Sequence, residues 1–202
     1  AQFTFIPECE ETPTPFTDQS TIGTGSITDW LWNFGDGTTS TLQNDSHIYQ
    51  SDGVYIASLL VTSAFGCQDW MTDSIEVFTI PEVDFDAPFV CQNDTVSVSD
   101  LSTSVQGNVI YWEWNFGDAT PVIYSQNTTH NYVLHGEYDI ELLVGTDKGC
   151  TNTVVKSYHS YPVPIPEYVR DYECERQIMR FRDSSLLDPI FNSYLVQWDW
   201  DF

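Results

Sequence analysis

Large apolar side chains alternate with smaller or polar ones along several short stretches of the chain. Trp30, Trp32 and Phe34 are two residues apart, so in an extended strand all three point to one face. The same spacing recurs at Trp112, Trp114 and Phe116, and again at Trp198, Trp200 and Phe202. An aromatic face opposite a mostly polar one predicts a half-buried antiparallel strand.

A second alternating stretch follows each of the first two aromatic ones. Its apolar positions are Tyr55, Ala57, Leu59 and Val61, and then Tyr138, Ile140, Leu142 and Val144. Gly, Asp, Asn and Ser separate these stretches, and no segment has a capped helical period. The pattern predicts an all-β protein built as β-sandwiches.

The chain repeats itself with a period of 82 or 83 residues. Cys9, Cys91 and Cys174 follow this period, and so do three aspartates, Asp18, Asp100 and Asp183. The repeat predicts two complete domains, residues 1–80 and 81–163, and the first part of a third, residues 164–202. Since the third unit stops after its aromatic strand, we expect that Phe202 is not the natural end of the molecule.

A glycine-rich turn follows the aromatic strand. Gly35-Asp36-Gly37 suits a tight chain reversal, because glycine adopts positive φ at little cost. We therefore interpret Asp36 and its counterpart Asp118 as turn residues, against the alternative that they are catalytic. Ala119 stands where the first unit has Gly37, which predicts a different turn type.

The net charge disfavours two classes of partner. Acidic residues outnumber basic ones 30 to 6, and the formal charge is −24. Such a chain repels nucleic-acid phosphates and anionic membrane surfaces. No apolar run reaches the roughly 20 residues that span a bilayer. With 41% hydrophobic residues the chain is nevertheless too apolar for a disordered acidic tail. We read the start at Ala1 as a mature or internal one.

Three ordered motifs, W-x-F-G-D, H-x-Y and G-x-Y, occur in both complete units and together resemble the PKD (polycystic kidney disease) domain family. The residues that carry the resemblance are Trp32, Phe34, Gly35, Asp36, His47, Tyr49, Gly53, Tyr55, Trp114, Phe116, Gly117, Asp118, His130, Tyr132, Gly136 and Tyr138. The resemblance implies tandem immunoglobulin-like sandwiches and structural roles for these residues. With proline-rich linkers such as 161–166, we expect the domains to be arranged as a rod.

The five cysteines can be paired within this repeat. One disulfide per repeat would join Cys9 to Cys67 and Cys91 to Cys150. Cys174 would then pair with a cysteine beyond the chain. The alternative is free buried thiols. Disulfides would imply an oxidising, extracytoplasmic location.

We expect no catalytic residues and no cofactor. His47 and His130 occupy the structural H-x-Y position, and no Ser or Cys nucleophile recurs beside a His and an acid. The carboxylates could hold calcium, but no compact D-x-D-x-D-G loop is present, and a solvated acidic face is the simpler interpretation.

The resemblance and the tandem array favour non-catalytic, extracellular repeats of a long cell-surface protein. The cysteines, the acidity and the array resemble the PKD repeats of Bacteroidota gliding-motility adhesins, which implies an adhesive or spacer stalk. Its partners would be other domains of the same chain and a surface glycan or protein. The alternatives are an accessory region of a secreted hydrolase, and a carbohydrate- or protein-binding module. Phe65 and Trp70 lack aromatic counterparts in the second unit, so a unit-specific contact could start there.

Overall fold

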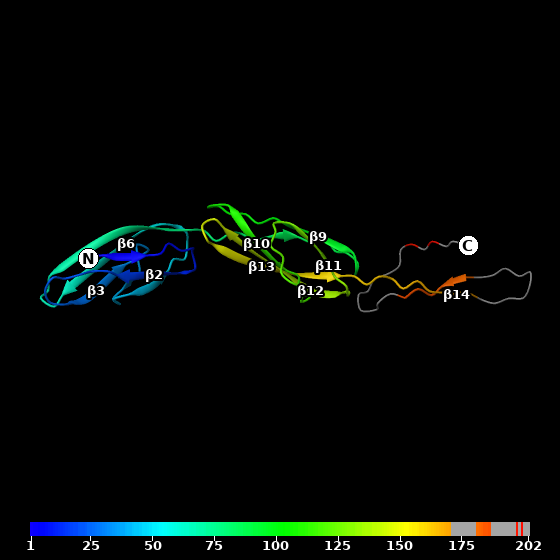
Figure 1. The fold of residues 1–202 in the computed structure, drawn as a ribbon, viewed down its shortest axis with the longest axis horizontal. Helices are drawn as coiled ribbons and strands as arrows, with labels where there is room; N and C mark the ends of the chain where they lie inside the picture. The colour runs from blue at the N-terminus through cyan, green and yellow to red at the C-terminus, as the bar shows by residue number, and fades with distance from the viewer. Residues whose placement is uncertain (171–180, 187–196, 198, 200–202) are drawn as a thin grey trace, which may run out of the picture. The chain divides into compact units, whose positions relative to one another are not determined.

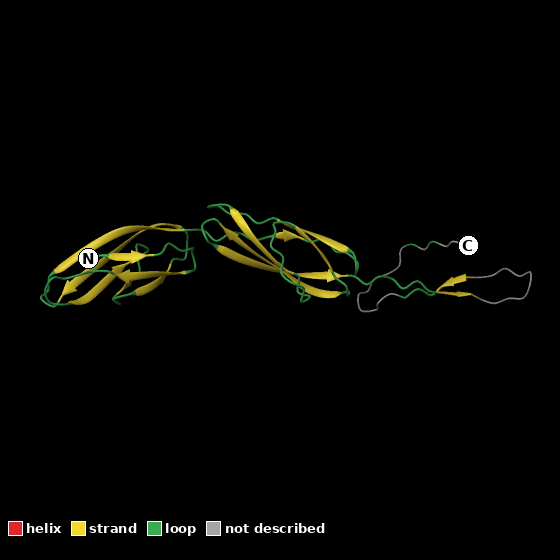
Figure 2. Cartoon of the chain, in the orientation of Figure 1, coloured by secondary structure: helices red, strands yellow, loops and turns green. Residues whose placement is uncertain are grey.

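The computed structural model describes residues 1–170, 181–186, 197 and 199. These residues form strands and loops and contain no helix, as Figure 2 shows. The predicted all-β, immunoglobulin-like fold is confirmed. Cys174 and the third aromatic motif, Trp198, Trp200 and Phe202, lie outside the described residues.

Seven strands form two sheets in the first repeat, residues 1–80 (Figure 1). One sheet has the order β1-β2-β5 and the other β4-β3-β6-β7, with antiparallel neighbours. The strands are β1 (Phe3–Phe5), β2 (Pro13–Asp18), β3 (Ile27–Asn33), β4 (Thr39–Ser40), β5 (Asp45–Ile48), β6 (Gly53–Ser63) and β7 (Gln68–Val77).

The inward faces of these two sheets share one core. Trp32 of β3 is fully buried, and its ring meets Phe3 of β1 edge-on at 5.3 Å and Phe16 of β2 at 5.6 Å. Leu59 of β6 and Ile75 of β7 complete the cluster with no exposed surface. The period-2 alternation therefore predicted the buried face correctly, because successive side chains of a strand point to opposite faces.

The second repeat, residues 81–163, uses the same pattern. One sheet has the order β8-β9-β11 and the other β10-β12-β13, and Trp114 and Leu142 are fully buried. The strands are β8 (Phe85–Asp86), β9 (Thr95–Asp100), β10 (Val109–Asn115), β11 (Thr128–Asn131), β12 (Gly136–Thr146) and β13 (Thr151–Ser160). Beyond it, β14 (Tyr168–Arg170) pairs antiparallel with β15 (Phe181–Asp183).

The density of contacts divides the chain differently from the sequence repeat. Unit 1 comprises Ala1–Asp84, Ser102–Trp112 and Leu143–Thr153; unit 2 comprises Phe85–Leu101, Glu113–Leu142 and Val154–Phe202. Three segments of the second repeat, residues 81–84, 102–112 and 143–153, thus belong to unit 1. From here on, "repeat" means the sequence division, residues 1–80 and 81–163, and "unit" means one of these two compact bodies.

The turn after the aromatic strand has two residues with positive φ in both repeats. Gly35 and Gly37 have φ of 85° and 96°, and Gly117 and Ala119 have φ of 72° and 65°. Ala119 adopts the left-handed conformation of the glycine it replaces. Such a conformation costs a residue with a Cβ about 1–2 kcal/mol. Pairing resumes one residue later in the second repeat, at Trp114 with Ile123, than in the first, at Trp32 with Ser40.

Candidate functional site

The residues of the W-x-F-G-D and H-x-Y motifs meet in one polar cluster at the end of β3. Asp36 lies in the turn, and its Oδ2 is 2.7 Å from Nε2 of His47 on β5. Thr38 donates to Asp36 Oδ1 from its hydroxyl at 2.6 Å and from its backbone N–H at 3.0 Å. One carboxylate thus fastens its own turn and connects it to a strand of the opposite sheet.

Aromatic rings enclose the histidine of this cluster. The His47 ring is stacked on Phe34 with centroids 4.2 Å apart, and meets Tyr49 edge-on at 4.6 Å. Tyr49 donates its hydroxyl hydrogen to the carbonyl of Phe34 at 2.9 Å and stacks on Tyr55 at 4.3 Å. The rings of Phe34, His47, Tyr49 and Tyr55 therefore form one continuous series of contacts.

The second repeat reproduces this geometry. His130 Nε2 is 2.7 Å from Asp118 Oδ2, and the Thr120 hydroxyl donates to Asp118 Oδ1 at 2.6 Å. The His130 ring lies 4.1 Å from Phe116, and Tyr132 donates to the Phe116 carbonyl at 3.0 Å. Two copies with matching distances support a role in the fold rather than in a unique reaction.

The cluster lacks the connection that nucleophilic catalysis needs. In a catalytic triad the acid orients the histidine, and the histidine takes the proton of the hydroxyl. Here the Thr38 hydroxyl donates to the carboxylate itself, while His47 Nε2 is 3.4 Å from Thr38 Oγ1. Both groups are therefore held by Asp36, and the arrangement is a structural cross-link.

The environment of the two aspartates changes their titration. Partial burial raises the pKa of the Asp36 carboxyl, but the bonds from Thr38 and His47 outweigh burial, and the pKa is lowered overall. Asp118 has a lowered pKa for the same reasons, with Thr120 and His130 as the donors. Burial, followed by the nearby Asp36 charge, raises the pKa of the Tyr49 hydroxyl.

These shifts predict a loss of stability in acid. A carboxyl whose pKa is lower in the folded state contributes stability above its unfolded pKa of about 4 and loses it as the pH falls through the folded pKa. We expect Asp36→Asn to cost about 1–3 kcal/mol at pH 7 and progressively less below pH 4. Urea unfolding of the wild type and of Asp36→Asn between about pH 7 and pH 2 measures this difference in the free energy of unfolding. A pH-independent difference would contradict it.

Asp18 follows the sequence repeat, but the repeat did not reveal its role. It accepts a hydrogen bond from the indole N–H of Trp30 at 2.7 Å and one from Gln43 Nε2 at 3.3 Å. Its pKa is lowered, since these bonds and those from Ser20 outweigh its partial burial. The period of 82 between Asp18 and Asp100 was the available signal, but it did not identify the partner.

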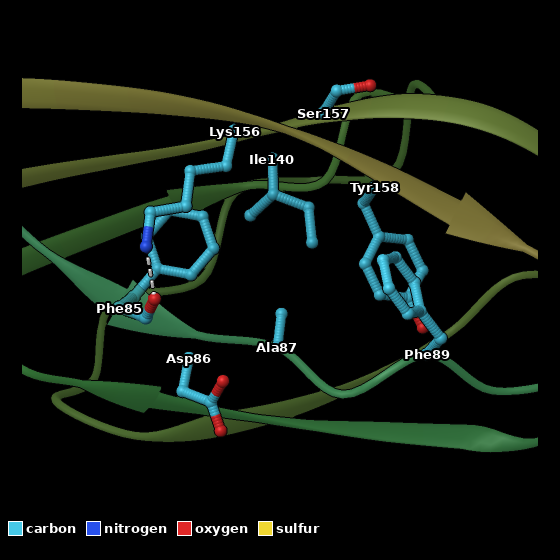
Figure 3. A pocket seen from close by; sticks show the side chains of 8 residues that line it. All are labelled: Phe85, Asp86, Ala87, Phe89, Ile140, Lys156, Ser157 and Tyr158. Carbon is cyan, nitrogen blue, oxygen red and sulfur yellow. Dashed lines mark hydrogen bonds between the residues drawn. The ribbon is translucent and has the colours of Figure 1, made fainter.

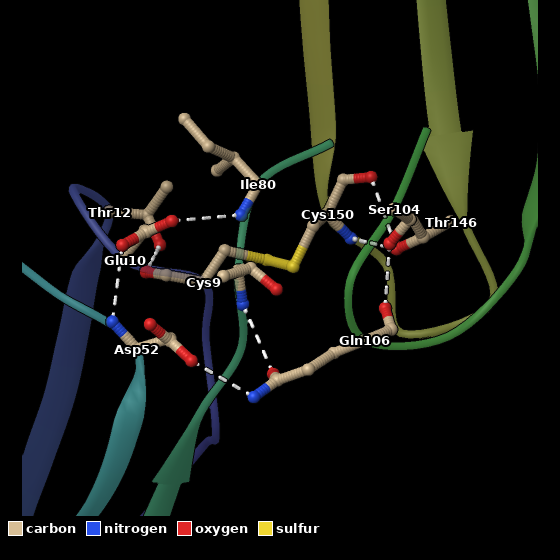
Figure 4. Close-up of a disulfide and its surroundings, with 10 residues drawn as sticks. Cys9, Glu10, Thr12, Asp52, Ile80, Ser104, Gln106, Thr146 and Cys150 are labelled. Carbon is tan, nitrogen blue, oxygen red and sulfur yellow. Dashed lines mark hydrogen bonds between the residues drawn. A yellow bond between two sulfur atoms is a disulfide. The ribbon is translucent and has the colours of Figure 1, made fainter. Parts of the chain in front are cut away.

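The disulfide prediction was wrong. The structure bonds Cys9 to Cys150, with Cα atoms 5.7 Å apart, and both residues belong to unit 1. Cys67 and Cys91 are free thiols. Figure 4 shows the bond between the chain after β1 and the start of β13. The bridge therefore joins residues of two different repeats, across 141 positions of sequence.

Strand length explains why the predicted pairs do not form. The backbone of Cys9 forms an isolated β-bridge with Phe78, just beyond β7. Cys67 comes directly before Gln68, at the other end of that strand. Ten residues of strand separate the two ends by on the order of 30 Å, and a disulfide needs Cα atoms within about 7 Å. Cys91 forms the equivalent β-bridge with Tyr161, at the far end of β13 from Cys150. The length of β13 therefore separates Cys91 from Cys150 in the same way.

Hydrogen bonds made by the side chains of Glu10 and Gln106 surround the disulfide (Figure 4). Glu10 accepts from the N–H groups of Ile80 at 3.2 Å and Asp52 at 3.1 Å. Gln106 accepts from the N–H of Thr79 at 3.2 Å and donates to Asp52 at 3.0 Å. Sequence reasoning missed Glu10 and Gln106 because each interacts with a segment distant in sequence.

A small cavity lies in unit 2 beside β8 and β13 (Figure 3). Its volume is about 190 Å³, whereas small-molecule pockets usually have about 300–1,000 Å³. Lys156 Nζ donates to the carbonyl of Phe85 and stands 4.6 Å from the centre of its ring. The lysine is therefore engaged by the protein itself, and we assign no ligand to this cavity.

Two features are absent from the described part of the chain. There, no group of three or more His, Cys, Asp or Glu residues is placed to hold a metal ion. Nor does that part contain a helix long and apolar enough to cross a bilayer.

Comparison with known proteins identifies similar sequences. The sequence profile of the PKD domain matches residues 6–80 and 78–160. Collagenase ColA of Bacillus cereus is 31% identical over 62% of this chain, and Pre-pro-metalloprotease PrtV of Vibrio cholerae is 28% identical over 64%. The match covers only 14% of either protein. A solved PKD1 domain of Vibrio anguillarum Epp is 25% identical, with a TM-score of 0.37 over 40% of this chain and 93% of that domain.

Proposed function

The chain belongs to the PKD domain family, and from this premise we propose that it is a non-catalytic, extracellular accessory region of a secreted protease. Its two complete repeats would act as folded modules next to a catalytic domain in the same polypeptide. The observation that carries this proposal is that curated relatives matching the repeats are named as collagenases and a metalloprotease. The relatives support this function better than a gliding-motility adhesin.

The geometry of the repeats supports a non-catalytic role. Both Asp–His pairs connect turns to strands, and in each the nearby threonine hydroxyl is bonded to the aspartate. The Cys9–Cys150 disulfide agrees with an oxidising location outside the cytoplasm. A folded, cross-linked, acidic module can position a neighbouring domain without taking part in its chemistry.

The native polypeptide provides the test. An antibody raised against this chain is used to blot the culture medium and the cell fraction of the source organism, beside a gelatin zymogram. We expect the antibody-reactive band to lie in the medium, to coincide with a zone of hydrolysis and to lose activity with a metal chelator. The purified chain, as the matched control, should cleave nothing.

Two outcomes would overturn the proposal. Hydrolysis by the purified chain would place catalysis within the repeats. An antibody-reactive band that carries no hydrolytic activity and stays with the cells would instead favour an adhesive or spacer stalk.

That stalk is the second candidate, and one observation favours it. Phe65 and Trp70, at the β6–β7 hairpin, expose 78% and 67% of their surface. Exposed aromatic side chains are frequent anchors of binding surfaces. If they hold the protein to a surface ligand, Phe65→Ala/Trp70→Ala should release the purified chain from source cells, measured by pull-down. Tyr124→Ala, which removes an aromatic side chain exposed to 62% in the second repeat, is the control.

A further inference from the structure

We propose that Cys67 and Cys91 are half-sites for further disulfides of the Cys9–Cys150 kind, each made with another PKD repeat that carries the complementary cysteine. Cys9 and Cys91 are the leading cysteines of their repeats, and Cys67 and Cys150 follow the β6–β7 and β12–β13 hairpin glycines. The observed bond joins the leading cysteine of one repeat to the hairpin cysteine of the next. This inference goes beyond the proposed function and does not depend on it.

Cys67 is held in the same way as the bonded Cys150. The N–H of Cys67 donates to Ser63 Oγ at 3.1 Å, and that of Cys150 donates to Thr146 Oγ1 at 3.2 Å. The carbonyls of both cysteines accept from the N–H of the same partner residues, at 2.8 and 2.9 Å. Gly66 and Gly149 precede them with φ of 80° and 86°. The backbone of the first hairpin thus holds Cys67 as that of the second holds Cys150.

Cys91 is held in the same way as the bonded Cys9. Both form an isolated parallel bridge to the residue beyond the last long strand of their repeat, Tyr161 and Phe78 respectively. The carbonyl of Cys91 accepts from the N–H three residues on at 3.0 Å, and that of Cys9 does so at 3.2 Å. The second residue after each cysteine, Asn93 and Glu11, has φ of 66° and 60°. Both half-sites are therefore preformed.

Burial distinguishes the bonded cysteines from the free ones. Cys150 and Cys9 keep 1% and 7% of their surface exposed, whereas Cys67 is exposed and Cys91 is intermediate. The backbone conformations match, so the difference lies in the presence of the complementary cysteine. A further repeat would cover Cys67 and Cys91 in the way that Cys9 and Cys150 cover each other.

The direction of pairing defines the partner. Cys91, a leading cysteine, requires a hairpin cysteine, and Cys67 requires a leading cysteine. A second copy of this chain provides both, because Cys67 of one copy complements Cys91 of another. We therefore expect head-to-tail covalent association of copies when no other repeat is present.

The bond forms by exchange with a small disulfide such as oxidised glutathione. The Cys91 thiolate attacks one sulfur of glutathione disulfide, forming a mixed disulfide and releasing one glutathione thiolate. The Cys67 thiolate then attacks the Cys91 sulfur and releases the second glutathione. Two protein thiols are oxidised, one glutathione disulfide is reduced to two thiols, and the two protons lost from the cysteines go to the glutathiones.

Two variants test the pairing directly. Cys174 is replaced by serine in both, because it too is a leading cysteine by sequence. One variant adds Cys67→Ser and keeps Cys91; the other adds Cys91→Ser and keeps Cys67. Each is incubated with oxidised glutathione, alone and mixed with the other, and products are separated on non-reducing gels and mapped by mass spectrometry. Circular dichroism confirms that both variants are folded.

We expect covalent dimers in the mixture only, with Cys67–Cys91 as the mapped bridge and Cys9–Cys150 intact. The heterodimer should exceed each homodimer by at least about tenfold, a preference of about 1.4 kcal/mol. Homodimers as abundant as the heterodimer would indicate unselective oxidation and overturn the proposal. So would the absence of any dimer, or an intramolecular Cys67–Cys91 bridge in the Cys174→Ser chain.

Discussion

Gly35→Ala should unfold the first repeat at a denaturant concentration well below that of the wild type, with a loss of about 3–4 kcal/mol. Gly35 has φ of 85°, and a Cβ placed on it would lie 2.6 Å from the carbonyl oxygen and 2.8 Å from the nitrogen of Ile56. Those atoms are backbone of β6, so a side-chain rotation cannot relieve the overlap. Urea unfolding followed by tryptophan fluorescence measures the loss.

Gly37→Ala is the matched control for this prediction. Gly37 also has positive φ, at 96°, but no atom lies within 4 Å of its added Cβ. Only the conformational cost of about 1–2 kcal/mol should remain. Ala119 already occupies the equivalent position of the second repeat, with φ of 65°. Equal losses for the two variants would show that the contact with Ile56 does not limit this position.

Replacing Cys150 by serine should destabilise unit 1 by about 2–4 kcal/mol. In the chain-entropy account, a bond across 141 residues removes up to about 5 kcal/mol of freedom from the unfolded chain, and native disulfides usually deliver less. The variant also leaves Cys9 buried without its partner, because Cys9 exposes only 7% of its surface. Guanidinium unfolding without reductant measures the effect.

Cys67→Ser is the control, since it changes the equivalent hairpin cysteine of the first repeat, which is exposed and free. A surface substitution of this kind usually changes stability by less than about 0.5 kcal/mol. If Cys67→Ser were as damaging as Cys150→Ser, the pairing within each repeat, Cys9 with Cys67 and Cys91 with Cys150, would be favoured again.

The alternating pattern alone was sufficient to predict the buried face of two strands in each repeat. Trp32, Leu59, Trp114 and Leu142 were assigned to inward faces and are fully buried. This success has a local cause: in a strand, the face on which a side chain lies depends only on whether its position is odd or even. The repeat likewise gave the motif residues, because equivalent positions in tandem domains keep equivalent spacing.

The tertiary structure decided which of those residues meet. Asp36 was expected to serve its turn, but its bond to His47 depends on where β5 lies against the end of β3. The cysteines show the same limit, since nearly equal spacing within each repeat suggested the pairs Cys9–Cys67 and Cys91–Cys150. Sequence separation does not reveal that a ten-residue strand holds the ends of each pair on the order of 30 Å apart. Period and composition thus determined the fold class and the buried faces, whereas the positions of the strand ends decided that Cys9 bonds to Cys150.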